Sequence, residues 1–248
     1  MEDRLQQFRA AYQAKISPLY NGWLHGAWIF GFGAVFIAWC ASRVENDGWA
    51  WLSVIPALLV ANLGEWWLHK NALHRRIDAL RALWHRHTIE HHNYFTEARM
   101  TVDSQREYRI ILFPPYAVLG IALIHALFGG LWALVFGADA GWAWMVGGMA
   151  HYLLYEVLHT AAHLPEHPLL ARLPLVNTLR RNHWVHHHQA LMADVNLNLT
   201  PPFADWLMGT SDLDRSLPGV LFNGYRMDRL KPAVARRLGE ARFPPPAN

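Results

Sequence analysis

The chain has 248 residues, of which 53% are hydrophobic, and it carries a formal net charge of +3 at pH 7. Its single cysteine, Cys40, excludes a disulfide framework within one chain. Aromatic and basic residues do not interleave along a surface stripe, so we expect no nucleic-acid partner. The 13 tryptophans, a residue type that favours the membrane–water interface, indicate an integral membrane protein.

Four apolar segments are long enough to cross a hydrocarbon core about 30 Å thick as helices. They extend over about 19–42, 49–68, 110–136 and 141–163. The connectors 44–48 and 137–141 are short and turn-like, so the four helices are expected to form two hairpins. Glu65, near the end of the second segment, is the only acidic or basic residue within that segment.

The basic residues predict the orientation. If both termini are cytoplasmic, the inside segments are 1–18, 69–109 and 164–248, and they hold 21 of the 22 Lys and Arg residues. In a prokaryote this membrane would be the bacterial inner membrane. The inside segments are expected to be mostly helical, including 75–92. The predicted fold is therefore all-α, with four transmembrane helices and a cytoplasmic helical cap in a single domain, residues 1–248.

Ten of the 16 histidines form four groups on the predicted cytoplasmic side. The groups are HxxxxH (His69, His74), HxxxHH (His87, His91, His92), HxxxH (His159, His163) and HxxHH (His183, His186, His187). Residues three or four apart share a helix face, so each of the last three groups is expected to present rings to one metal. His69 and His74 are five apart, so the second helix should end or distort near Asn71. Ten imidazoles suit two metal ions.

Other interpretations of histidines stay open. A cytoplasmic cluster can also be a pH sensor or a loose metal-binding patch, but neither predicts four spaced groups. Four histidines within or near the apolar segments are interpreted as ordinary polar residues: His25, His125, His151 and His167. Three carboxylates, Glu65, Glu156 and Asp205, are candidates to accept an imidazole N–H and fix the tautomer of a ligand. Their alternatives are structural, such as a helix N-cap for Asp205.

The order of the groups, with a hydrophobic hairpin between the second and the third, resembles the fatty acid hydroxylase/sterol desaturase superfamily. YEVLHTAAH, from Tyr155 to His163, is similar to its Tyr-acidic-x-x-His-x-x-x-His helix. HWVHH, from His183, is similar to its last histidine box, and TPPFADWLMGT, from Thr200 to Thr210, to its closing Asp-x-x-x-Gly-Thr signature. The resemblance covers roughly residues 60–210.

This resemblance implies a dimetal centre under a cytoplasmic cap, with the ten histidines as ligands of two iron ions, although such sites also hold zinc. It implies an O2-dependent lipid hydroxylase acting on a fatty acyl or sterol-like substrate. A desaturase on the same scaffold is the alternative. A metal-binding transporter or sensor is an alternative of another class, which the scarcity of intramembrane polar residues disfavours.

Electrons must come from a partner. The chain has no GxGxxG motif, no cysteine cluster and no obvious haem segment, so we expect a separate electron donor, a reductase with a ferredoxin or a cytochrome. Five basic residues are candidates for docking an acidic carrier or lipid head groups: Arg75, Arg76, Arg81, Arg180 and Arg181.

Overall fold

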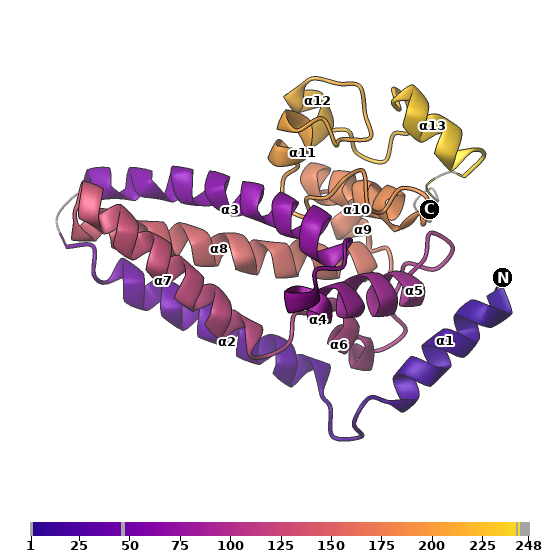
Figure 1. The fold of residues 1–248 in the computed structure, drawn as a ribbon, viewed down its shortest axis with the longest axis horizontal. Helices are drawn as coiled ribbons and strands as arrows, with labels where there is room; N and C mark the ends of the chain where they lie inside the picture. Colours follow the sequence, from indigo (N-terminus) through magenta and orange to yellow (C-terminus); the bar gives the residue numbers. More distant parts are fainter. Residues whose placement is uncertain (1, 46–47, 242, 244–248) are drawn as a thin grey trace.

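A computed structural model describes residues 2–45, 48–241 and 243. Over these residues the chain is helical and forms no strand, only two isolated β-bridges. The long helices are α2 (Gly22–Ala41), α3 (Val54–Leu68), α7 (Ala117–Phe136) and α8 (Ala138–His163). They lie side by side at one end of the molecule, and the shorter helices gather at the other end (Figure 1). The expected all-α class is confirmed.

The shorter helical elements are of three types: α-helices, 3-10 turns and π-helical turns. The α-helices are α1 (Glu2–Ala14), α4 (Arg81–Trp84), α5 (His92–Tyr94), α6 (Tyr108–Ile111), α9 (Pro168–Arg172), α10 (Pro174–His187), α11 (Phe203–Leu207), α12 (Leu217–Leu221) and α13 (Pro232–Leu238). Short 3-10 turns are η1 (Gly48–Ser53), η3 (Asp78–Leu80) and η5 (Gln105–Glu107), and π-helical turns are η2 (His69–Leu73) and η4 (His85–His91). From Asp78 to Tyr94 the helical turns follow one another without a break, as expected for most of 75–92.

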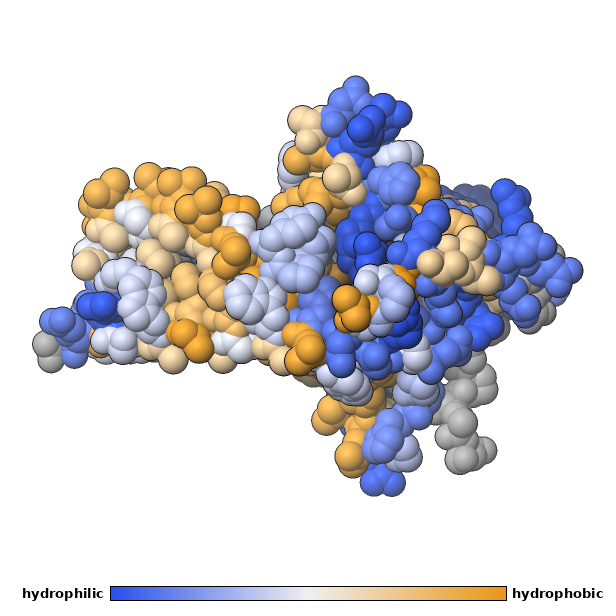
Figure 2. All heavy atoms as spheres, turned by 90° about the horizontal axis from the view of Figure 1, so that it is seen from below, coloured by the Kyte–Doolittle hydropathy of each residue, from blue (hydrophilic) through white to orange (hydrophobic). Residues whose placement is uncertain are grey.

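Three helical segments of the described chain are long and apolar enough to cross a membrane: Gly22–Ala41, Gly48–Leu73 and Ala117–Phe136. Their outward side chains are apolar and exposed, such as Leu24 at 70%, Leu123 at 72% and Leu134 at 83%. Figure 2 shows this end mostly orange and the opposite end mostly blue. Three exposed apolar helices of this length are consistent with a membrane protein.

The fourth predicted segment is α8, which packs against α2, α3 and α7. A Cβ added at Gly147 of α8 would be 3.0 Å from Val54 O, and one at Gly141 would be 2.6 Å from Gly129 O. The small residues therefore let α3 and α7 approach the α8 backbone closely. Helix α8 lies at the buried centre of the bundle and is less apolar than α2, α3 and α7. Its role as a fourth span stays a prediction.

Two expectations about the helices need correction. The third segment does not begin near Ile110, because α6 ends at Ile111 and Pro114-Pro115 separates it from α7. The first two long helices do not pack mainly on each other; α8 lies between α2 and α3 (Figure 1). The second pair, α7 and α8, is a hairpin whose link is Gly137, with φ of 91°. Residues 46–47 of the predicted connector 44–48 lie outside the described residues.

Candidate metal centre

The predicted ligands come together in the interior, where the membrane helices meet the shorter ones. Each of the ten histidines is at most 8% exposed. Two sets of ring nitrogens could each hold a metal ion. The first set, group 1, is His69, His74, His87, His92 and His186. The second set, group 2, is His91, His163, His183 and His187. The tenth histidine, His159, lies beside group 2, with its Nε2 3.3 Å from His91 Nε2.

The division between the groups corrects the expected sharing of faces. His87 and His91, four apart, were expected to face one metal, but they fall in different groups. The reason is that this box lies on the π-helical turn η4, in which the backbone N–H of residue i+5 bonds to the carbonyl group of residue i. The backbone N–H of His92 donates to His87 O, so these two share a face. Similarly, His186 faces group 1 while its neighbours His183 and His187 face group 2.

The same π-helical geometry confirms the distortion expected near Asn71. The turn η2 begins at His69, and the backbone N–H of His74 donates to His69 O over 3.1 Å. In an ordinary α-helix a spacing of five would turn the two rings apart. Here the two rings stack with centroids 4.9 Å apart. The HxxxxH spacing is therefore matched to a π-helical turn.

The nitrogen–nitrogen distances within each group suit shared coordination. In group 1, His87 Nε2 is 2.9 Å from His69 Nε2 and 3.1 Å from His92 Nε2. In group 2, His183 Nε2 is 2.9 Å from His163 Nε2 and 3.0 Å from His187 Nε2. Two nitrogens that are each about 2.1 Å from one ion, at angles of about 90–110°, are about 3.0–3.4 Å apart.

Backbone carbonyl groups fix the tautomers of five rings. His69, His91, His163, His186 and His187 each have Nδ1 against a carbonyl oxygen, and the acceptors are those of Leu197, Ile110, Met100, Val195 and Phe95 respectively. A neutral imidazole has one N–H, which must lie on Nδ1 to make these bonds. The Nε2 atoms that face the group centres are then unprotonated and able to bind a metal.

The pair His91 and His187 decides whether these rings suit an ion. Both rings use Nδ1–H on a carbonyl, so neither Nε2 has a hydrogen, yet the two Nε2 atoms are 3.2 Å apart. Burial lowers the pKa of both rings well below 6.5, so neither is protonated at pH 7. Two lone pairs at this distance repel each other unless a cation lies between them. The donor set therefore fits a metal ion, and its all-imidazole chemistry suits iron or zinc.

An apolar pocket reaches both groups from one side. Its apolar wall is formed by Leu73, Leu83, Ile110, Ile111, Leu112 and Phe113. His87 of group 1, His91 of group 2 and His159 also line it, together with Tyr155. Arg86 also lines the pocket, and its guanidinium donates to Arg109 O and to Leu112 O, the latter at 2.8 Å. The pocket is small, about 30 Å³ in volume, and its mostly apolar lining matches an apolar group better than a polar one.

Comparison with known proteins bears on this centre. A sequence model of the family named fatty acid hydroxylase matches residues 54–210, which include all ten histidines and the closing signature. This chain belongs to the fatty acid hydroxylase family. No curated protein and no solved structure matches the chain. The resemblance drawn from the histidine boxes is confirmed, and α1 and α2 of this fatty acid hydroxylase family member lie before the matched region.

In the described part of this family member, the three candidate carboxylates have hydrogen-bond partners other than the ligand rings. Glu65 accepts from the backbone N–H of Leu199 and Thr200, and its Oε2 is 3.4 Å from His151 Nε2. Glu156 accepts from Tyr152 and Phe113, and Asp205 accepts from the N–H of Leu197 and Asn198. The expected imidazole–carboxylate bonds are replaced by imidazole–carbonyl bonds. A backbone carbonyl has no sequence signature, so sequence reasoning missed these acceptors.

The predicted docking arginines divide into two sets. Arg75, Arg76 and Arg81 are exposed, and Arg76 pairs with Asp78 at 3.0 Å. Arg180 and Arg181 are only 7% and 0% exposed, so they are not available for docking, which corrects that expectation. Both have structural partners. Arg180 donates to Ala161 O in the last turn of α8 and to Leu164 O just after that helix. Arg181 forms an ion pair with the buried Asp212 at 2.6 Å.

The other histidines mostly behave as ordinary polar residues, as expected. His25 has Tyr20 and Phe113 O as hydrogen-bond partners, and His167 accepts from the N–H of Leu169 at the start of α9. His151 lies against Glu65 and Thr200. His125 Nδ1 is buried and has no hydrogen-bond partner among the described residues.

The buried rings predict how the metal-free protein responds to acid. Burial lowers the pKa of seven rings outside the long helices, those of His74, His87, His91, His92, His183, His186 and His187, well below 6.5. Below pH 6.5 the unfolded chain therefore binds more protons than the folded chain, and stability is lost as pH falls, by up to about 1.4 kcal/mol per ring and pH unit. We expect the thermal unfolding temperature of metal-free protein to fall between about pH 7 and pH 5.5. An unchanged unfolding temperature over this range would contradict the neutral state of the rings.

Proposed function

We propose that this chain is a membrane-bound, O2-dependent lipid hydroxylase whose two histidine groups hold two iron ions. The observation that carries the proposal is the facing pair of unprotonated nitrogens of His91 and His187, which calls for a cation. Group 1 would hold one ion through its five rings, and group 2 would hold the other with His159 beside it. Membership of the fatty acid hydroxylase family supports this chemistry.

The proposed membrane topology has four spans, with α8 as the fourth, and both termini in the cytoplasm. Three apolar helices and the distribution of basic residues support it. The shorter helices would then form a cytoplasmic cap over the centre, in one domain spanning residues 1–248. In a bacterium this would be the inner membrane.

The residues of the pocket would hold the substrate. An acyl chain or a sterol-like ring system entering from the bilayer would lie against Leu83, Ile111 and Phe113, beside His87 and His91. This apolar wall orients the chain and excludes water from the reacting carbon. Bound iron supplies the oxidising chemistry with O2 that an unactivated C–H bond requires. The protein's own part is to keep the ligand nitrogens unprotonated and the lipid carbon in place.

A separate electron donor is part of the proposal, since the chain carries no cofactor motif of its own. The donor would be a reductase with a ferredoxin or a cytochrome. The exposed residues Arg75, Arg76 and Arg81 are the part of the predicted basic surface that remains available for an acidic carrier.

The experiment that tests this function is lipid mass spectrometry of cells with and without the protein. A hydroxylase adds one oxygen to a lipid and shifts its mass by about +16, whereas the alternative, a desaturase, removes two hydrogens and shifts it by about −2. We expect the +16 product, and we expect His159→Ala to abolish it. A cell that gains neither product when the protein is expressed with an electron donor would contradict the enzymatic proposal and favour a metal transporter or sensor.

A further inference from the structure

The two histidine groups take their carbonyl acceptors from two separate segments. In group 1, His69 and His186 use Leu197 O and Val195 O, which lie in the loop after α10. In group 2, the acceptors are Phe95 O, Met100 O and Ile110 O, all in the segment 95–110, which begins just after α5. The bonds to His187, His163 and His91 therefore depend on a different part of the chain from those of group 1.

The loop that serves group 1 is held by carboxylates. Asp205 of α11 accepts from the backbone N–H of Leu197 at 3.0 Å and of Asn198 at 2.7 Å, and it is fully buried. Glu65 of α3 accepts from the next two N–H groups along the loop. These bonds fix the backbone around Leu197, whose carbonyl oxygen faces the His69 ring of group 1.

The segment that serves group 2 is held by α1. Arg9 of α1 is 4% exposed and donates to Tyr94 O at 3.2 Å, to Asp103 at 2.9 Å and to Glu107 at 3.0 Å. Its guanidinium also lies over the Tyr94 ring, 4.2 Å from the centroid. Arg9 thus ties together both ends of the stretch that contains Phe95 O and Met100 O.

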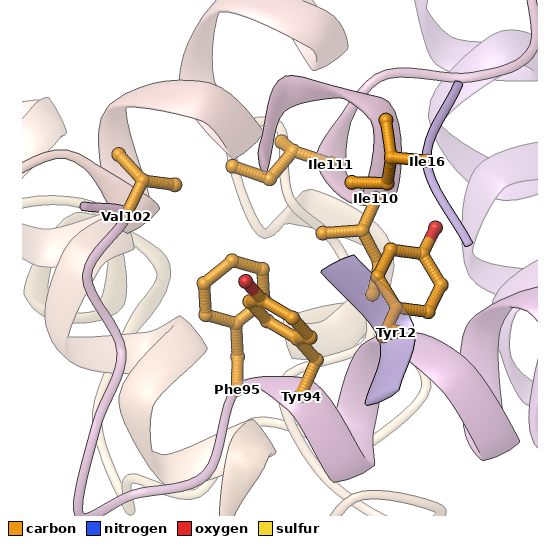
Figure 3. Packing of buried hydrophobic residues seen from close by; sticks show 7 residues of the cluster. All are labelled: Tyr12, Ile16, Tyr94, Phe95, Val102, Ile110 and Ile111. Carbon is orange, nitrogen blue, oxygen red and sulfur yellow. The ribbon is translucent and has the colours of Figure 1, made fainter. Parts of the chain in front are cut away.

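Apolar packing continues this support up to the rings. Figure 3 shows Tyr12 and Ile16, which follow Arg9, packed with Tyr94, Phe95, Ile110 and Ile111 in and beside the segment, with Val102 in the same cluster. The Phe95 ring lies against His163 with centroids 4.1 Å apart and against His91 at 5.4 Å. The contact from α1 to group 2 is therefore continuous, and α1 lies outside the region that the family model matches.

We propose that Arg9 is a positioning residue for group 2 alone, as Asp205 is for group 1, so that the two ion sites can be weakened separately. The inference rests on the two-ion centre proposed above. Partners that orient ligand histidines typically change metal affinity about 10–100-fold when they are lost. Arg9 acts through three acceptors in or directly beside one segment, and it contacts neither Val195 nor Leu197 of the other segment.

The test measures Fe2+ binding to the full-length purified protein without lipid or electron donor. Metal-free protein is titrated with chelator-buffered Fe2+ under anaerobic conditions, and bound iron per chain is determined by elemental analysis. We expect two ions in the native chain. Arg9→Gln should raise the free Fe2+ needed to fill one site about 10–100-fold and leave the other unchanged. Arg4→Gln is the matched control, since Arg4 is an exposed residue of the same helix, and it should bind as the native chain does.

A double-mutant comparison identifies the site that is weakened. In the Arg9→Gln background, a further His183→Ala in group 2 should cost no additional ion at limiting Fe2+, whereas His74→Ala in group 1 should remove the remaining one. Asp205→Asn should show the reverse pattern. Should Arg9→Gln fail to fold, Arg9→Lys replaces it, with a smaller weakening confined to the same site.

Two outcomes would overturn the inference: equal weakening of both sites by the Arg9 variants, or no weakening of either. A native chain that binds fewer than two ions would instead contradict the proposed dimetal centre. The binding assay therefore separates a failure of the inference from a failure of the proposed function.

Discussion

Replacing His91 with alanine is expected to abolish the lipid product and to lower the iron content of the purified protein. His91 Nε2 lies 3.2 Å from His187 Nε2 and 3.3 Å from His159 Nε2, so this nitrogen is close to both rings. Its loss removes a proposed ligand and opens the centre toward the pocket that it lines. We expect product formation to fall at least about 100-fold, beyond the effect of losing an orienting partner. Product is measured by lipid mass spectrometry and iron by elemental analysis.

The matched control is His85→Ala in the same π-helical turn. The His85 side chain is 57% exposed and belongs to neither group. This variant should keep the iron content and the product of the native chain. Equal losses in the two variants would mean that disturbance of the η4 turn, rather than loss of a ligand, explains the result.

Filling the pocket should separate substrate access from metal binding. Leu83 of α4 is half-buried and lines the apolar wall, and no atom of it is a candidate ligand. We expect Leu83→Trp to reduce product formation at least about 10-fold because the larger side chain occupies space that the lipid needs. The iron content should stay that of the native chain. Both quantities are measured on the same preparation, so a loss of activity through loss of metal would be recognised.

Leu80→Trp provides the control for this variant. Leu80 is 36% exposed on the preceding turn and does not line the pocket. The same substitution there should leave product formation unchanged. If Leu83→Trp is as active as the native chain, the lipid reaches the metals by another path and the pocket is not the substrate site.

The sequence predicts the helical class, and it contains the histidine boxes that converge in the structure, because both depend on local patterns. Apolar segments of about 20 residues and histidines near helix ends can be read without knowing the tertiary structure. The third span was predicted to begin near Ile110, but α7 begins at Ala117. The apolar pattern of the sequence continues through Pro114-Pro115, whereas a helix does not.

The assignment of rings to ions could not be predicted in this way. It depends on whether the helical period at each box is that of an α-helix or a π-helix, and a spacing of four, as in His87 and His91, looks favourable for an α-helix. The sequence gives a hint at His69 and His74, where a spacing of five fits only a wider turn. The carbonyl acceptors, such as Phe95 O and Leu197 O, come from distant segments through tertiary packing and have no pattern along the chain.

The central claim, that imidazoles from distant helices converge on two ions, is tested most directly by an anomalous-scattering map of iron-loaded crystals of the full-length protein. We predict two iron peaks, one bounded by the Nε2 atoms of group 1 and one by those of group 2. A single peak, or iron bound away from these rings, would contradict the account.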